Sequence, residues 1–192
     1  MSPDGSTTVS TQSRIVIFTL GRFEILLNGN PLRFKGRAPV RSLELLTLLV
    51  AAGDGGASAG RLADQLWPDA DGFDAYRAFT TTLHRLRRLL GCHDAVRLSA
   101  GRLSLDPTIC TIDAWDFERA LRGAADPEAI EAVLDSYPGP FMADDQSPWS
   151  LATRERLHEL MTRTAKRLAR WGKENGVRPH FLANGVRPVF AF

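Results

Sequence analysis

The sequence has few cysteines and no long apolar stretch, and each absence excludes a class of protein. Its two cysteines, Cys92 and Cys110, provide neither a disulfide framework nor the spacing of a zinc site, so we expect a reduced, cytoplasmic protein. No apolar run approaches the ~20 residues that span a bilayer, so no membrane association is expected. Residues 1–13 lack the charged and apolar segments of a secretory signal, and we interpret them as a disordered tail.

The sequence also lacks the patterns that accompany catalysis or metal binding. It contains no HExxH segment, no paired cysteines and no evident set of nucleophile and base. Residues 53–60, GDGGASAG, lack the Lys-Ser/Thr pair of a phosphate-binding loop, and we interpret them as a flexible connection between helices. Asp113, Asp116 and Glu118 fall in the predicted first turn of a helix, whose positive end favours acidic residues. We therefore predict no enzyme, no cofactor and no metal.

Charge is unevenly distributed along the chain. The 192 residues are 44% hydrophobic, enough for one ordinary domain or two small ones, and the net charge of +2 says little about partners. Residues 14–107, however, hold 13 Lys/Arg against 9 Asp/Glu, whereas residues 108–192 hold 11 against 12. The basic excess of the first half is a weak indication of a polyanionic partner.

Residues 76–90, YRAFTTTLHRLRRLL, contain four arginines, three threonines and a histidine but no acidic residue. Phe79, Leu83, Leu86 and Leu90 recur at spacings of four, three and four, which predicts a helix with one apolar face. A solvated helix face normally mixes both charge signs, and unpaired arginines repel one another by a few tenths of a kcal/mol per pair. A phosphate backbone reverses that penalty. We therefore predict that this helix binds nucleic acid.

Specific roles can be assigned on the outer face of this helix. The residues nearest its centre are predicted to contact base edges in the major groove: Thr80, Thr81, His84 and Arg85. Arg77 and Arg88, at its two ends, are predicted to bind phosphates. Arg87 is nearer the core boundary and could instead pair with an acidic residue elsewhere in the fold.

The segments around this helix have a recognisable order. Residues 15–36 predict a small antiparallel sheet with a turn at NGN, and two helices follow, the second with Ser58 as N-cap and Pro68 beyond its end. Residues 96–105 alternate so that Leu98 pairs with Leu103 and Val96 with Leu105 in a hairpin. Arg102 stands beside its turn, either entering the minor groove or simply exposed. Sheet, two helices, cationic helix and hairpin form an α+β winged helix-turn-helix with an N-terminal antiparallel sheet and a C-terminal β-hairpin wing.

Two family resemblances support this interpretation. Residues 14–107 resemble the OmpR/PhoB-type effector domain through SLELLTLLVAAG, SAGRLADQLWP and TTLHRLRRLLG. The segments DAWDFERAL, YPGPFMADD and PWSLATRERL resemble the helical bacterial transcriptional activator (BTAD) domain of SARP-type regulators. Residues 108–174 are therefore expected to form a partial, small all-α (tetratricopeptide-like) domain, and residues 175–192, which contain NGVRP twice, an irregular tail.

The resemblance implies a bacterial, sequence-specific transcription regulator that binds double-stranded DNA at direct repeats, with monomers head to tail. It also implies that the loop with Asp69 and Asp71 contacts RNA polymerase, although a polar connector would have the same composition. The helical domain would mediate self-association or bind a partner. Two alternatives stay open: a protein-interaction module whose winged helix no longer binds DNA, and a ligand-sensing or enzymatic domain. The aromatic residues of the second half favour core packing over a ligand cavity: Trp115, Phe117, Tyr137, Phe141 and Trp149.

Overall fold

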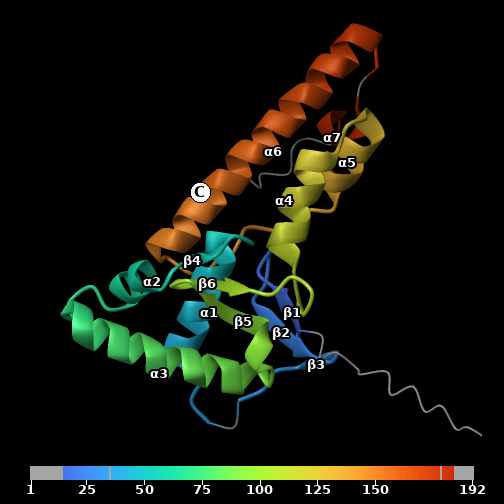
Figure 1. Cartoon of the computed structure of the whole chain (residues 1–192). Helices are drawn as coiled ribbons and strands as arrows, with labels where there is room; N and C mark the ends of the chain where they lie inside the picture. Colours follow the sequence, from blue (N-terminus) through green and yellow to red (C-terminus); the bar gives the residue numbers. More distant parts are fainter. Residues whose placement is uncertain (1–14, 35, 178, 184–192) are drawn as a thin grey trace, which may run out of the picture.

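The computed structural model describes residues 15–34, 36–177 and 179–183. The predicted tail of residues 1–13 and residues 184–192 lie outside this range. Two small sheets and a set of helices share one continuous apolar core, and the cationic helix lies at the edge of the molecule opposite the C-terminal helices (Figure 1).

The N-terminal sheet begins as an antiparallel meander, as the sequence predicts. It contains β1 (Ile15–Phe18), β2 (Glu24–Leu27) and β3 (Asn30–Pro31). Asn28 and Gly29 form the turn between β2 and β3 with φ of 51° and 81°, the positive values that a two-residue hairpin turn requires.

A fourth strand corrects the prediction of a purely antiparallel sheet. β7 (Cys110–Ile112) follows the hairpin in sequence and pairs with β1 in parallel, so that the strand order is β3-β2-β1-β7. Cys110 and Ile112 are buried and Thr111 between them is half-buried, the alternation of a strand with one face on the core. β7 covers the open edge of β1. Residues assigned by sequence to the second domain thus complete the sheet of the first.

Three helices follow the meander. They are α1 (Val40–Ala52), α2 (Ala59–Leu66) and α3 (Gly72–Leu90). The predicted N-cap of α2 is confirmed, because Ser58 Oγ accepts a hydrogen bond from the Arg61 backbone N–H at 3.3 Å. α2 ends at Leu66, two residues before Pro68.

A short 3₁₀ turn (His93–Ala95) leads into the predicted hairpin of β5 (Val96–Ser99) and β6 (Arg102–Leu105). Its register is confirmed: Leu98 pairs with Leu103 and Val96 with Leu105. Leu98 alone of these four is exposed, at 41%. A short strand that the sequence did not suggest, β4 (Ala57–Ser58), pairs with β6.

The glycine-rich segment before β4 is held in place, contrary to the prediction of a flexible connection. Gly56 has a φ of +62°, and a Cβ at this position would lie 2.0 Å from the Leu103 backbone oxygen. Only glycine permits so close an approach of two backbones.

The second half is helical: α4 (Asp113–Gly123), α5 (Pro127–Asp135), α6 (Pro148–Asn175) and α7 (His180–Ala183). α7 forms within the predicted irregular tail, where the Phe181 N–H donates to Glu131 on α5 at 3.1 Å. The Trp115 indole N–H donates to the Val50 carbonyl at 2.8 Å and so joins α4 to α1. No helix in the described part of the chain has both the length and the apolar character needed to cross a bilayer.

The two cysteines differ in environment, which gives a first prediction. Burial, and next the nearby Asp106 charge, raise the pKa of Cys110 to about 12, whereas Cys92 is only half-buried. Only the thiolate reacts with iodoacetamide, and at pH 8 a thiol with this pKa is about one part in 10⁴ ionised. We expect mass spectrometry to find Cys92 alkylated first in the folded protein and Cys110 only after denaturation. Equal labelling of both thiols would contradict the packing around β7.

Candidate nucleic-acid interface

The cationic helix α3 is capped at both ends. The Asp71 carboxylate accepts hydrogen bonds from the Phe73 and Asp74 backbone N–H groups at 3.0 and 2.9 Å. At the other end Gly91 adopts the left-handed conformation, with φ of 66°. These caps stabilise a helix of 19 residues, which is longer than the acid-free segment and begins four residues before it.

One face of α3 is buried as predicted. The four residues at the four-three-four spacing are at most 4% exposed, and they pack in the common core with α1 and α2: Phe79, Leu83, Leu86 and Leu90. This packing fixes the rotation of the helix about its own axis. The predicted contact residues on the opposite face are all exposed: Arg77, Thr80, Thr81, His84, Arg85 and Arg88. Figure 1 shows α3 on the outside of the molecule, with α6 running away from it.

The basic side chains in the second half of this outer face have no partner within the described part of the molecule. The side chains of His84, Arg85 and Arg88 form no hydrogen bond or ion pair with any described residue. Arg85 and Arg88 are separated by three positions, so their guanidinium groups repel each other on the helix surface. An external anion would relieve this repulsion.

Arg77 differs from the other cations because it has an acidic neighbour. Its Nη1 lies 3.6 Å from Asp74 Oδ1, and both side chains are well exposed, at 71% and 64%. The Arg77 guanidinium also lies 5.8 Å from the centre of the Phe73 ring. An exposed pair of this kind contributes about 0–1 kcal/mol, so a phosphate can replace the carboxylate at little cost.

The two exposed threonines direct their hydroxyl hydrogens into the helix. Thr80 Oγ1 donates to the Tyr76 carbonyl at 2.9 Å, and Thr81 Oγ1 donates to the Arg77 carbonyl at 3.1 Å. These hydroxyls therefore present acceptor lone pairs and a methyl group outward. That combination suits a cytosine amino group or a thymine methyl better than a phosphate.

A groove runs along the first half of α3 and adds two residues that the sequence did not suggest. It encloses about 810 Å³ between α3, the start of α1 and the end of α2. Arg41 from α1 and Trp67 from the end of α2 line it together with Arg77, Thr81 and Arg85. The Arg41 guanidinium lies 6.0 Å from the Trp67 ring centre and 2.9 Å from Glu44. No sequence pattern around Arg41 indicates a place in this groove, because the proximity of Arg41 to α3 depends on the packing of α1 against α3.

Two arginines predicted to face outward or to meet an acid are held by backbone carbonyls instead. Arg87 donates through Nε and Nη2 to the Val96 carbonyl, at 3.0 and 2.8 Å, and so fastens α3 to β5. Arg102 donates from Nε to the Gly55 carbonyl at 2.6 Å and from Nη2 to the Gly56 carbonyl at 3.1 Å. The Arg102 side chain therefore lies along the glycine-rich segment and does not project freely from the hairpin turn, although it is exposed.

The hairpin is also anchored by a buried carboxylate. Asp106, 1% exposed, forms an ion pair with Arg97 and accepts hydrogen bonds from the Thr108 N–H and hydroxyl at 2.8 and 2.7 Å. Burial alone would raise the pKa of Asp106, but these hydrogen bonds and the Arg97 charge outweigh it and hold the pKa below its usual range. The ion pair fixes the strand at the base of the hairpin.

The two acids predicted to contact RNA polymerase have different surroundings. Asp71 is occupied as the N-cap of α3, a role that its position before the helix could have suggested. Asp69 is exposed and has no partner among the described residues.

Comparison with known proteins shows the fold but no family. No family model matches the sequence, and no curated protein matches it. Among solved structures, the chain is similar to Mycobacterium tuberculosis EmbR in complex with a low-affinity phosphopeptide, at 18% identity and a TM-score of 0.64. The match covers 90% of this chain and 49% of that one, so the chain spans about half the length of the EmbR structure. At this identity the similarity shows the fold alone: the arrangement of sheet and helices in this chain is similar to that in the matched half of the EmbR chain.

Proposed function

We propose that the chain is a sequence-specific, double-stranded DNA-binding transcription regulator of the SARP type. The observation that carries the proposal is the outer face of α3, where His84, Arg85 and Arg88 are exposed and unpaired within the described chain. The shared fold supports it, since EmbR is itself a SARP-family regulator. The function requires no catalysis and no cofactor.

In this proposal α3 enters the major groove. Thr80, Thr81, His84 and Arg85 read base edges, while Arg77 and Arg88 bind phosphates on either side. Arg41 is added to the phosphate-binding set because it lines the same groove as Arg77. The hairpin lies on the flanking DNA as a wing, with Arg102 contributing through Nη1, which is not used in its bonds to the loop carbonyls.

Further parts of the proposal rest on the family resemblance. Monomers bind direct repeats head to tail, and the helical half mediates self-association or partner binding. Asp69 is the candidate contact to RNA polymerase, since Asp71 already caps α3. Each of these three features can be tested, and can be wrong, without affecting the proposal that α3 binds DNA.

The proposal predicts salt-dependent binding to a selected sequence. Genomic fragments enriched by the purified chain should share a motif, and a duplex carrying it should bind with an affinity that falls as salt rises. If about four phosphates are neutralised per monomer, the slope of log K against log[salt] should be near −3.6. Fluorescence anisotropy measures this directly. Enrichment without a shared motif, or a slope near zero, would contradict the proposal.

A protein-interaction module is the second candidate. Two large apolar side chains at the start of α3, Phe73 and Tyr76, are 74% and 49% exposed, and such side chains favour protein contacts. A mobility-shift assay with mixed genomic fragments separates the two candidates, because the interaction module would leave all fragments unshifted.

A further inference from the structure

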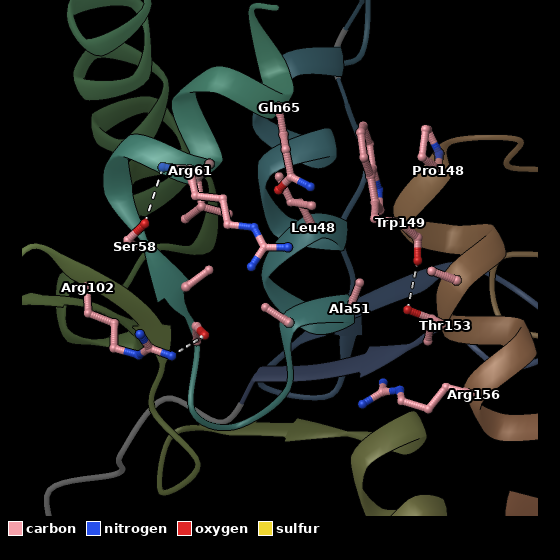
Figure 2. A pocket seen from close by; sticks show the side chains of 15 residues that line it. Leu48, Ala51, Ser58, Arg61, Gln65, Arg102, Pro148, Trp149, Thr153 and Arg156 are labelled. Carbon is pink, nitrogen blue, oxygen red and sulfur yellow. Dashed lines mark hydrogen bonds between the residues drawn. The ribbon is translucent and has the colours of Figure 1, made fainter. Parts of the chain in front are cut away.

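A second hollow lies away from the outer face of α3, between the helix-turn-helix and the long helix α6. It encloses about 620 Å³, within the roughly 300–1,000 Å³ typical of small-molecule sites. Its walls come from α1, from α2 and the segment that leads into it, from β6 and from the first turns of α6. Figure 2 shows Arg61 reaching from α2, and Arg156 from α6, into the same space.

The charge of this pocket is of one sign. Three arginines line it, Arg61, Arg102 and Arg156, and its described lining contains no carboxylate. Arg102 binds only carbonyl oxygens there, and the Arg61 side chain has no partner among the described residues. Arg156 lies 3.5 Å from Glu118, a carboxylate that it shares with Arg122. The positive charge in the pocket is therefore largely uncompensated, and an anion would offset it.

The lining also has an apolar part that includes a flat ring. Leu48, Ala51 and Ala52 come from α1, and Pro148 and Trp149 come from the start of α6, the helix that also carries Arg156. The Trp149 indole N–H is itself buried and has no acceptor among the described residues. An occupant with an apolar ring and an anionic group matches the apolar side chains and the arginines of this lining.

The wall formed by α6 is held firmly. Asp145 accepts hydrogen bonds from the Ser147 N–H at 2.9 Å and the Ser150 hydroxyl at 2.6 Å, which fix the first turn of the helix. Arg154 donates to the Phe141 and Met142 carbonyls at 2.8 and 3.0 Å. The pocket is thus formed before any ligand binds, which reduces the entropic cost of binding.

From this geometry we propose that the pocket binds a small organic anion, a carboxylate or phosphate attached to a flat apolar body. The anionic group binds between Arg61 and Arg156, and the apolar body packs against α1 and Trp149. Because the walls belong to both halves of the chain, an occupant fastens α6 to the helix-turn-helix. The proposal does not depend on DNA binding by α3.

The test is calorimetric titration of the full chain with benzoate and phenyl phosphate, with benzyl alcohol as the uncharged analogue and inorganic phosphate as the anion without a ring. We expect at least one of the two organic anions to bind saturably. Benzyl alcohol and inorganic phosphate should each bind at least about 10-fold more weakly than that anion. Arg61→Ala is expected to lower the affinity for the organic anion about 10-fold or more. Ala152→Trp, which fills the pocket without changing charge, is expected to abolish binding.

The matched control is Arg170→Ala, which removes the same charge from an exposed position on α6 outside the pocket. Failure of both organic anions to bind at about 10 mM overturns the proposal. An equal loss of affinity for the organic anion in Arg61→Ala and Arg170→Ala also overturns it. An Arg61→Ala variant that loses the same factor in affinity for duplex DNA as for benzoate also overturns it, because Arg61 would then belong to a phosphate-binding face. Since Arg61 is exposed, this variant keeps the test decisive even if Ala152→Trp fails to fold.

Discussion

Arg85→Ala is expected to weaken binding to the selected duplex about 10- to 100-fold and to relax sequence preference at one base pair. Arg85 lies at the centre of the outer face of α3, is exposed and has no partner among the described residues. A guanidinium in that position can form two parallel hydrogen bonds to a guanine edge, and the alanine side chain can form none. Binding curves for the selected duplex and for single-base variants of it measure both effects.

Arg88→Ala provides the contrast. It removes the same charge from the end of the same face, where we expect a phosphate contact. It should therefore lower the affinity for all duplexes by a similar factor and reduce the slope of log K against log[salt] by about 1. Arg170→Ala on α6 controls for loss of charge alone. Neither α3 variant should lower thermal stability, because each relieves a like-charge repulsion. If Arg85→Ala and Arg88→Ala reduce binding to every sequence equally, the assignment of base and phosphate contacts is wrong, although DNA binding is not.

The features that sequence predicted correctly depend on neighbours close in the chain. The buried face of α3 follows from the spacing of Phe79, Leu83, Leu86 and Leu90, and the hairpin register follows from alternation on either side of a two-residue turn. In both cases side chains within a few residues of each other determine which face meets the core.

The features that sequence did not predict depend on partners far along the chain. β7 is three residues long and its parallel partner β1 lies nearly a hundred residues earlier, so no local period could reveal the pairing. Arg87 and Arg102 bind backbone carbonyls, and any residue type can supply a carbonyl. Arg41 and the 620 Å³ pocket likewise exist only because helices distant in sequence pack together.

Asp113 is the clearest case of a local explanation that proved insufficient. The positive end of a helix accounts for an acid at this position, but the structure gives its carboxylate specific donors just beyond the end of β1. Its oxygens accept hydrogen bonds from the Thr19 N–H at 2.8 and 2.9 Å, from the Thr19 hydroxyl at 2.8 Å and from the Leu20 N–H at 3.0 Å. Thr19 and Leu20 are 0% and 2% exposed, so these donors have no access to water.

Asp113→Ala is therefore expected to lower the free energy of unfolding by about 3–5 kcal/mol, because it leaves several buried donors unsatisfied. Asp116→Ala is the matched control: it removes an acid from the same helical turn, but one that is exposed and that, within the described part of the chain, is bonded only to Arg119, at 2.8 Å. If the helix end were the main reason for both acids, each substitution would cost about 0.3–1 kcal/mol. Urea denaturation of the two variants distinguishes these accounts, since equal small losses would favour the helix-end explanation. A large loss confined to Asp113→Ala would show that this carboxylate is needed to satisfy the buried donors that follow β1.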